Sequence, residues 1–501
     1  MSKSSYFAGW LIDGTGTPAQ QDILICVENG LILSLEKANP AECNRAGLTV
    51  ETDSPPFSKG GRPHKRSGAN LKYLTSVGSV SANPNEVRVR PHKRSDANLK
   101  RLASVGSVSA NPNEVRVRPH KRSDANLKRL ASVGNVNANP SEVRVQGGFY
   151  PACTILPGLI DCHVHLSMSG KIDQNLRFRQ LLNDFAQNSP LICERIEKSL
   201  ASGIMALRDG GDIGGHTLTY IRQNGPSHVR VKCPGKAWRA PGRYGKIIGR
   251  IPEDGSTLAE SIKANREVVD HIKIINSGLN SLSEFGRETL PQFNRDELEA
   301  AFQNARKLGQ KVMVHANGKL PVQFAVEAGC DSIEHGFFMG EDNMKRMADR
   351  QVFWVPTAVT MKAMRAHMPA GNEAAKDSQV ASRMLEAQLE QMGRARELGV
   401  RLAAGTDAGS FGVRHGVALA EELKLIIEAG FSVEEAIGCA TSAGARLLGL
   451  DHELGRLAPG MPANFIIVPG PPSSLPDSLA DVKAVCVNGK RIIISGETVS
   501  G

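Results

Sequence analysis

Residues 155–165 read ILPGLIDCHVH, a short apolar run that ends in two histidines. Seven more short runs follow it, most of them separated by segments with helical periodicity. They are IMALRDGG (204–211), VRVKCPGKA (229–237), HIKIINSG (271–278), KVMVHANG (311–318), SIEHGFF (332–338), VFWVPTA (352–358) and RLAAGTDAG (401–409). Eight alternating β–α units predict a parallel (β/α)8 barrel over residues 157–450.

The segments between these runs carry helix start signals. Asn294 with Glu297 forms a capping box and predicts a helix over 294–309. Ser189-Pro190 predicts the start of another helix, and Ser432 the start of a third. The apolar face of the 294–309 helix is expected to consist of Leu298, Ala301, Phe302, Ala305 and Leu308.

Both ends of the chain are strand-like. Residues 20–35 (QQDILICVENGLILSL) alternate in polarity around Asn29-Gly30, a dipeptide typical of tight hairpins. Residues 463–468 and 482–494 repeat this pattern, with Asn488-Gly489 as the turn. We therefore predict a small β-sandwich domain built from both chain ends, with its parts at residues 1–61, 146–156 and 451–501.

A threefold repeat interrupts this β domain. Copies of 28 residues occupy 62–89, 90–117 and 118–145. Three interpretations stay open: a flexible insertion tolerated in a loop, a small solenoid, or a basic surface for nucleic acid or another anionic partner. Tyr73 is the single aromatic residue in the repeat, which disfavours a platform for base stacking.

Charge and cysteine usage bound the class of protein. The net charge is +10, but the repeat contributes 17 − 5 = +12, so the remainder carries −2. This distribution argues against nucleic acid as a general partner. Nine cysteines without a CxxC pair predict reduced thiols and a cytoplasmic location. We expect no signal peptide, no membrane partner and a small-molecule substrate, and a homo-oligomer is left open.

Five residues at predicted strand ends have side chains that bind metals. His163 and His165 are two positions apart on one strand, so both side chains face one side. His315, His335 and Asp407 follow apolar residues of later runs. Each could alone be a polar residue of a core or loop, but five such residues at one rim predict a metal site.

These motifs resemble the amidohydrolase superfamily, especially its imidazolonepropionase-like and prolidase-like branch. The resemblance is carried by PGLIDCHVHL (157–166), Lys273 in HIKIINSG, and the three runs that contain His315, His335 and Asp407. The closing segments CATSAGARLLGL (439–450) and GRLAPGMPANFIIV (455–468) are also similar to that family. The similarity covers nearly the whole chain outside the repeat.

The resemblance implies two divalent metal ions, with zinc expected first and manganese, iron or cobalt also compatible. His163, His165 and Asp407 would bind one ion, and His315 and His335 the other. Lys273 would be N6-carboxylated and bridge both ions. The alternative is an ordinary lysine beside a single metal.

The implied reaction is hydrolysis of a carbon–nitrogen bond, with Asp407 as the proton acceptor. A dipeptide or N-acyl amino acid is the expected substrate. Tyr244, Arg243 and His415 are candidate substrate contacts, although a purely structural role in loops fits them equally well. Two other functions stay open: a cyclic amidase or deaminase acting on a heterocycle, and a non-catalytic protein that binds a partner through the basic repeat.

Overall fold

The structure is a computed structural model that describes residues 3–45, 48, 146–225, 227–265, 267–367 and 372–492. The three repeats at 62–145, with every prediction made for them, lie outside the described residues. In the part of the chain that is described, no helix combines the length and apolarity that crossing a membrane requires.

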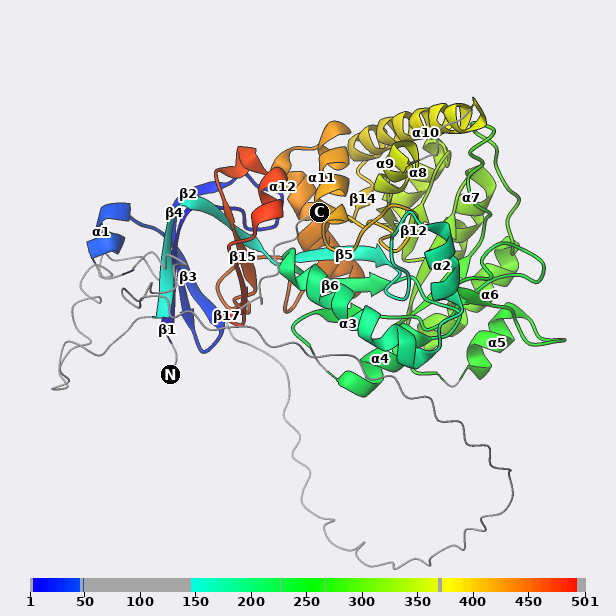
Figure 1. Cartoon of the computed structure of the whole chain (residues 1–501), viewed down its shortest axis with the longest axis horizontal. Coiled ribbons are helices and arrows are strands. Elements are labelled where there is room, and N and C mark those ends of the chain that lie inside the picture. The colour runs from blue at the N-terminus through cyan, green and yellow to red at the C-terminus, as the bar shows by residue number, and fades with distance from the viewer. Residues whose placement is uncertain are drawn as a thin grey trace, which may run out of the picture. The chain divides into compact units, whose positions relative to one another are not determined.

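Strands from both chain ends form one seven-stranded sheet (Figure 1). Its two turns, at Asn29-Gly30 and Asn488-Gly489, lie where the sequence predicts hairpins. The strand order is β17-β16-β15-β4-β1-β2-β3. The bounds are β1 (Lys3–Leu11), β2 (Gln20–Glu28), β3 (Leu31–Lys37), β4 (Gln146–Pro157), β15 (Phe465–Pro469), β16 (Ala484–Val487) and β17 (Lys490–Ile492).

This sheet corrects the predicted sandwich. Instead of two stacked sheets, all seven strands are hydrogen-bonded into a single sheet, because β4 pairs with β1 on one side and β15 on the other. The sheet curls so that its β3 edge meets the segment before β15. The Ile32 amide donates to the Met461 carbonyl over 2.8 Å, and the Ala463 amide donates to the Gly30 carbonyl over 2.8 Å. Buried apolar side chains of this sheet, among them Tyr6, Ile25 and Phe465, form one cluster.

The eight predicted runs all contain parallel strands. One sheet has the order β5-β6-β7, and the other has the order β14-β13-β12-β11-β10-β8-β9. The bounds are β5 (Leu159–Val164), β6 (Ile204–Asp209), β7 (Arg230–Lys232), β8 (Ala237–Trp238), β9 (Gly249–Arg250), β10 (His271–Ile275), β11 (Lys311–Ala316), β12 (Ser332–His335), β13 (Phe353–Val355) and β14 (Arg401–Leu402).

The third run is split at Pro234-Gly235, so β7 pairs with β6 whereas β8 pairs with β10. At the other edge, the Cys162 amide of β5 donates to the Ala404 carbonyl over 2.9 Å. The Asp407 amide donates to the His163 carbonyl over 2.7 Å. The segment that follows β14 is therefore hydrogen-bonded to β5, and the order of the parallel strands is consistent with a (β/α)8 barrel.

Helices follow most of these strands (Figure 1). Their bounds are α1 (Pro40–Arg45), α2 (Gln174–Leu181), α3 (Phe185–Ala201), α4 (His216–Asn224), α5 (Leu258–Ala264), α6 (Arg295–Lys307), α7 (Lys319–Ala328), α8 (Glu341–Asp349), α9 (Val359–His367), α10 (Asn372–Glu397), α11 (Ala418–Glu428), α12 (Val433–Gly438) and α13 (Gly444–Leu448). A π-helical turn η1 (Cys439–Ala443) joins the last two, and 3-10 turns η2 (Pro472–Ser474) and η3 (Asp477–Asp481) follow.

Of the three predicted helix starts, two are confirmed and one is wrong. Asn294 caps α6 and Ser432 caps α12, each in a capping box with the glutamate three residues on. The start at Ser189-Pro190 is wrong, because Asp184 already caps α3 in a box with Gln187 and Pro190 lies inside the helix. Leu308 is also outside the buried face: it follows the last turn of α6 and is 52% exposed.

Candidate metal centre

His163 lies near the carboxyl end of β5 and His165 directly follows the strand, and both are buried. Neighbouring backbone approaches them so closely that only glycine fits. A Cβ on Gly405 would lie 2.9 Å from the His163 backbone nitrogen, and one on Gly210 would lie 2.5 Å from His165 Cε1. Because the imidazole of His165 has this little space, it has few alternative rotamers.

Each of four imidazoles has one ring nitrogen anchored by the protein. His163 Nδ1 bonds Glu334 Oε2 at 2.8 Å, and His165 Nδ1 bonds the Gly211 carbonyl at 2.9 Å. His315 Nε2 bonds the Gly278 carbonyl at 3.2 Å. His335 Nδ1 bonds Thr357 Oγ1 at 2.7 Å. Anchoring one nitrogen orients the ring and leaves the other nitrogen available as a ligand, as in known metal sites.

Three ligand atoms converge between β5 and the segment after β14. One atom each from His163, His165 and Asp407 lie within 4.8 Å of one another. Asp407 Oδ1 is 3.6 Å from His163 Nε2 and 3.3 Å from His165 Nε2. Two imidazole nitrogens and one carboxylate oxygen at this spacing form a donor set that suits a divalent transition metal.

The other two predicted ligands lie beside this group. The ring of His335 is 5.0 Å from that of His163 and 4.5 Å from that of His315, measured between centroids. His315 ends its pairing with β10 at Ile275, and His335 is the last residue of β12. The structure therefore brings together four imidazoles, three from β5, β11 and β12 and one from the residue that follows β5 by one position.

Two polar atoms in this group have no hydrogen-bond partner among the described residues: Lys273 Nζ and Asp407 Oδ1. Lys273 is only 1% exposed and lies on β10. An unpaired buried amine or carboxylate oxygen is costly, so such atoms indicate a missing ligand. These two orphaned atoms, beside four anchored imidazoles, fit bound divalent metal.

Burial sets the protonation states of the group. It lowers the pKa of His315 to about 3 and the pKa values of His163 and His335 well below their ordinary range. These rings are neutral near pH 7, which is the form that binds a metal. Burial also lowers the pKa of Lys273 to about 8 and raises the pKa of Asp407.

A buried ion pair between Arg208 and Glu334 supports the histidines, and the sequence did not lead us to expect it. Glu334 accepts from Arg208 Nη2 over 2.8 Å and from Ser332 Oγ, besides orienting His163. Arg208 also donates to the Cys162 carbonyl over 2.7 Å. The sequence held a signal for this ion pair: Glu334 is a charged residue inside an apolar strand, and Ser332, two positions earlier, shares its face.

Asp161 and Asp209 are second supports at the same rim. Asp161 accepts from Thr406 Oγ1 over 2.7 Å and from the Thr406 amide over 3.0 Å, which ties β5 to the segment carrying Asp407. Asp209 accepts from the Leu166 amide over 2.8 Å. Burial raises the pKa of Asp161 to about 7 and that of Asp209 to about 6.

Three non-glycine residues at this rim have positive φ: His335 at 68°, Thr357 at 49° and Asp407 at 56°. A β-branched residue such as threonine rarely adopts this conformation. Each costs on the order of 1–3 kcal/mol and persists only where surrounding contacts impose it. Such strain gathers at functional sites, and here two of the three residues belong to the ligand group.

The three predicted substrate contacts lie in different surroundings. Tyr244 is half-buried, with its ring centroid 5.6 Å from that of His315. Arg243 is exposed and donates to the Leu290 carbonyl over 2.7 Å. His415 is buried and donates to the Met168 carbonyl over 2.8 Å. Of the three, the structure brings Tyr244 to the ligand group.

One further cation lies near Asp407. Arg177 of α2 donates to the Gly409 carbonyl over 2.8 Å and interacts electrostatically with Asp407. A small apolar cluster consists of Met168, Ala237, Ile248 and Ile275, and Tyr244 packs against it. The sequence carries little signal for Arg177, because it lies in a short polar helix without a motif.

Comparisons with known proteins identify the family of this chain. A family model described as the amidohydrolase family matches residues 154–499. An uncharacterized protein of Mycobacterium tuberculosis is 28% identical over 302 residues, which cover 59% of this chain and 74% of that protein. An ochratoxinase of Aspergillus niger is 25% identical over 342 residues, covering 62% and 69%. An imidazolonepropionase of Polaromonas sp. is 25% identical over 355 residues, covering 62% and 74%.

Solved structures share the fold. A crystal structure of a Xaa-Pro dipeptidase with methionine bound in its active site superimposes with a TM-score of 0.65. The alignment covers 98% of this chain and 100% of that one, at 21% sequence identity. At this identity the match supports the architecture, including the sheet built from both chain ends, but carries no assignment of substrate.

Proposed function

Because the chain belongs to the amidohydrolase family and is a hydrolase acting on carbon–nitrogen bonds, we propose that it cleaves an amide-type bond at a metal centre. The proposed ligands are His163, His165, Lys273, His315, His335 and Asp407. The observation that carries the proposal is the convergence of His163, His165 and Asp407 within 4.8 Å. A closed (β/α)8 barrel over 157–450 and the domain limits given above are part of the same proposal.

Divalent metal bound here would lower the pKa of a bound water toward neutrality and polarise the scissile carbonyl. Asp407 then has the proton-transfer role. Its Oδ2 is held by Ser410 Oγ over 2.8 Å, whereas Oδ1 faces the histidines without a partner. Oδ1 takes a proton from the attacking water and returns it to the amine nitrogen as the C–N bond breaks. The products are a carboxylate and an amine.

Lys273 is proposed to carry an N6-carboxyl group. A lysine ammonium cannot bind a cation, and this side chain is buried without a hydrogen-bond partner among the described residues. Reaction of the neutral amine with carbon dioxide forms a carbamate and releases one proton. The carbamate offers two oxygens, which would bridge the His163–His165 half of the group and the His315–His335 half. Zinc is the proposed metal.

A dipeptide or N-acyl amino acid is the proposed substrate. Tyr244, beside His315, is placed to contact a substrate carbonyl, and the apolar cluster around Ile248 and Ile275 would take an apolar side chain. Arg177, which interacts electrostatically with Asp407, is proposed to pair with a carboxylate of the substrate.

The test combines metal analysis with a substrate panel. Purified full-length protein should contain about two zinc, manganese, iron or cobalt ions per chain and hydrolyse dipeptides or N-acyl amino acids faster than their carboxyl-amidated analogues. His163→Ala should lose metal and activity, whereas the matched control His452→Ala, at an exposed position, should keep both. A chain that binds no transition metal would refute the proposal.

The carboxyl group on Lys273 has its own test. Protein exposed to ¹³C-bicarbonate should show one carbamate signal by ¹³C NMR, and Lys273→Arg should abolish that signal. Lys311→Arg is the control, since Lys311 lies at the opposite end of β11. A native chain that binds two metals without a carbamate signal would contradict this part of the proposal.

A second candidate reaction is hydrolysis or deamination of a heterocycle, favoured by the similarity to an imidazolonepropionase. One metal per chain, together with activity on cyclic amides in the same panel, would favour this function. The location is proposed to be cytoplasmic, because all nine cysteines of the chain are free thiols.

A further inference from the structure

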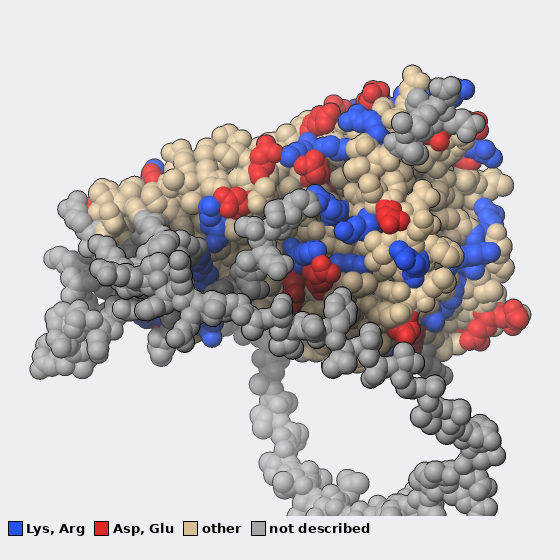
Figure 2. Space-filling view, in the orientation of Figure 1, with Lys and Arg blue, Asp and Glu red and all other residues tan. Residues whose placement is uncertain are grey.

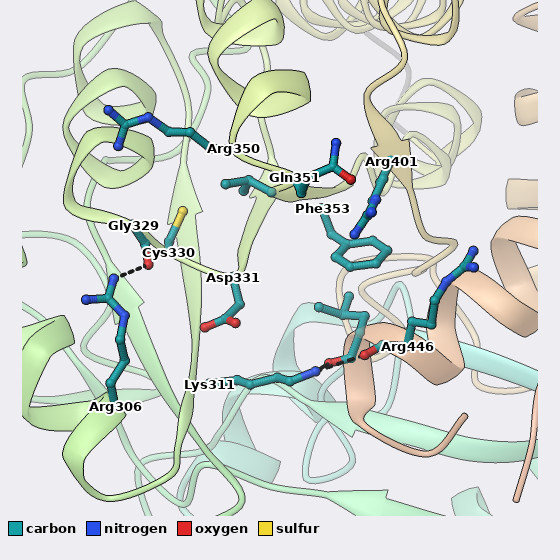
Figure 3. A pocket seen from close by; sticks show the side chains of 12 residues that line it. Arg306, Lys311, Gly329, Cys330, Asp331, Arg350, Gln351, Phe353, Arg401 and Arg446 are labelled. Carbon is teal, nitrogen blue, oxygen red and sulfur yellow. Dashed lines mark hydrogen bonds between the residues drawn. The ribbon is translucent and has the colours of Figure 1, made fainter. Parts of the chain in front are cut away.

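A polar cavity lies at the amino ends of the parallel strands (Figure 3). It has a volume of about 520 Å³. Lys311 begins β11, Phe353 begins β13 and Arg401 begins β14, whereas the metal centre lies at the other ends of these strands. At about 3.3 Å per residue, the short strands separate the two sites by on the order of 10–15 Å.

The lining of this cavity is strongly cationic. Five basic side chains border it, with Asp331 as the one carboxylate; they are Arg306, Lys311, Arg350, Arg401 and Arg446. Arg306 and Arg350 stand on one side of the opening, and Arg401 and Arg446 on the other (Figure 3). The cations therefore surround the space instead of forming a single cluster.

None of these five cations has a carboxylate oxygen within 4.0 Å among the described residues. Elsewhere on the molecule the pattern differs: Arg394 pairs with two glutamates, and Lys424 pairs with Glu421 and Asp477. On the face shown in Figure 2, basic and acidic side chains lie next to each other. The cavity thus has an excess of positive charge that the described part of the chain does not neutralise.

Four of the five cavity cations are bound to backbone carbonyls or to an aromatic ring. Lys311 Nζ donates to the Arg446 and Leu447 carbonyls, and Arg306 Nη2 donates to the Gly329 carbonyl over 2.8 Å. Arg401 lies over the ring of Phe353, 5.7 Å from its centroid. These contacts hold the basic side chains in position and use few of the donors of each guanidinium. Positioned guanidinium groups bind phosphate and carboxylate through paired hydrogen bonds.

We propose that this cavity binds a small polyanion with two or more phosphate or carboxylate groups. The volume is within the range of small-molecule sites, and cations on opposite sides match an anion with separated charged groups better than a single anion. Asp331 is itself occupied, since it accepts from the Val312 amide over 2.7 Å. The anion would complete the charge balance that Asp331 alone does not supply.

Titration calorimetry on the full chain at fixed ionic strength tests the site. Tripolyphosphate and citrate distinguish phosphate from carboxylate sources, and sulfate serves as a single-anion comparison. The double variant Arg401→Ala/Arg446→Ala should weaken binding of the better polyanion at least ten-fold. The control Arg456→Ala/Lys490→Ala removes the same charge from exposed positions outside the cavity and should change binding less than two-fold.

A variant with the opposite expected effect guards against loss of fold. Asp331→Asn keeps an oxygen for the Val312 amide but removes the negative charge, so it should tighten polyanion binding several-fold. Equal weakening in the two double variants would show that the ligand is held by charges elsewhere and would overturn the proposal. Unchanged or weaker binding in Asp331→Asn would also overturn it.

Discussion

The two ends of strands β11 to β14 carry contrasting polar groups. At the carboxyl ends, His315, His335 and Asp407 are enclosed, and the protein itself anchors one atom of each side chain. At the amino ends, Lys311 and Arg401 border an open cavity and bind backbone carbonyls or an aromatic face. The same strands therefore present a rigid donor set at one end and a group of cations without carboxylate partners at the other.

This contrast shows how the environment determines what similar polar residues can do. Burial lowers the pKa values of His315 and His335, so both rings are neutral. It also removes water from several polar groups, and a bound cation would offset that cost. The four arginines at the amino ends are exposed, and their attraction to an anion is long-range. Variants at the two ends should accordingly fail in different measurements.

The largest expected effect comes from Asp407→Asn. The amide keeps the size and the hydrogen bond from Ser410 but cannot take a proton, so kcat should fall by about 10²–10⁴-fold. Metal content, measured by mass spectrometry, should remain near that of the native chain. Asp451→Asn, at an exposed position, is the control and should be fully active. Native activity in Asp407→Asn would exclude the proposed proton route.

Glu334→Gln should have the next largest effect. An amide nitrogen in place of Oε2 donates to His163 Nδ1 and forces the ring proton onto Nε2, the atom that faces Asp407. We expect metal affinity to fall about 10–100-fold, as chelator competition would measure.

The matched control is Glu341→Gln, which removes an exposed carboxylate paired with Arg394 and Lys345. Its metal affinity should equal that of the native chain. If both variants bind metal like the native protein, the hydrogen bond between Glu334 and His163 does not contribute to metal affinity. The metal ligands would then not depend on the hydrogen bonds that orient them.

Glu422 should introduce a pH dependence of stability at the carboxyl-end rim. It accepts from the Ala358 and Val359 amides, and burial raises its pKa to about 8. Between pH 4.5 and 8 the unfolded chain loses this proton whereas the folded chain keeps it. The free energy of unfolding therefore falls as pH rises through this window, by at most about 1.4 kcal/mol per pH unit.

Denaturant titrations across this window check that slope. Glu422→Gln cannot ionise and should show a shallower decline with rising pH, because burial also raises the pKa values of Asp161 and Asp209, which still contribute. The neighbouring Glu421→Gln should retain the full decline, because ion pairs with Lys362 and Lys424 lower the pKa of Glu421 and its titration lies at more acidic pH. Parallel slopes for the native chain and Glu422→Gln would show that another group is responsible.

The smallest expected effect is at the amino ends. Lys311→Met removes two hydrogen bonds to the carboxyl-terminal carbonyls of α13 and should lower the free energy of unfolding by about 1 kcal/mol. Metal content and kcat should be unchanged. A loss of activity comparable to that of Glu334→Gln would show that the groups at the two strand ends are coupled and do not act independently.

Local sequence patterns predicted most of the elements. The alternation around Asn29-Gly30 and the capping box at Asn294 each concern residues a few positions apart, so the physical interactions are present in the sequence itself. Pro190 misled the prediction, because a proline is compatible with the first turn of many helices but here follows an earlier cap at Asp184. The predicted sandwich failed for a similar reason, since residue alternation does not specify which strand edges meet.

The sequence by itself determined the order of β–α units, the hairpin turns and the presence of His163, His165, His315, His335 and Asp407 at strand ends, because strand and helix periodicity are short-range properties. Only the tertiary structure decided that Glu334 orients His163, that Lys273 has no partner among the described residues and that five cations surround one cavity. Those features depend on which side chains packing excludes from water and brings together across distant parts of the chain, and no local pattern encodes that.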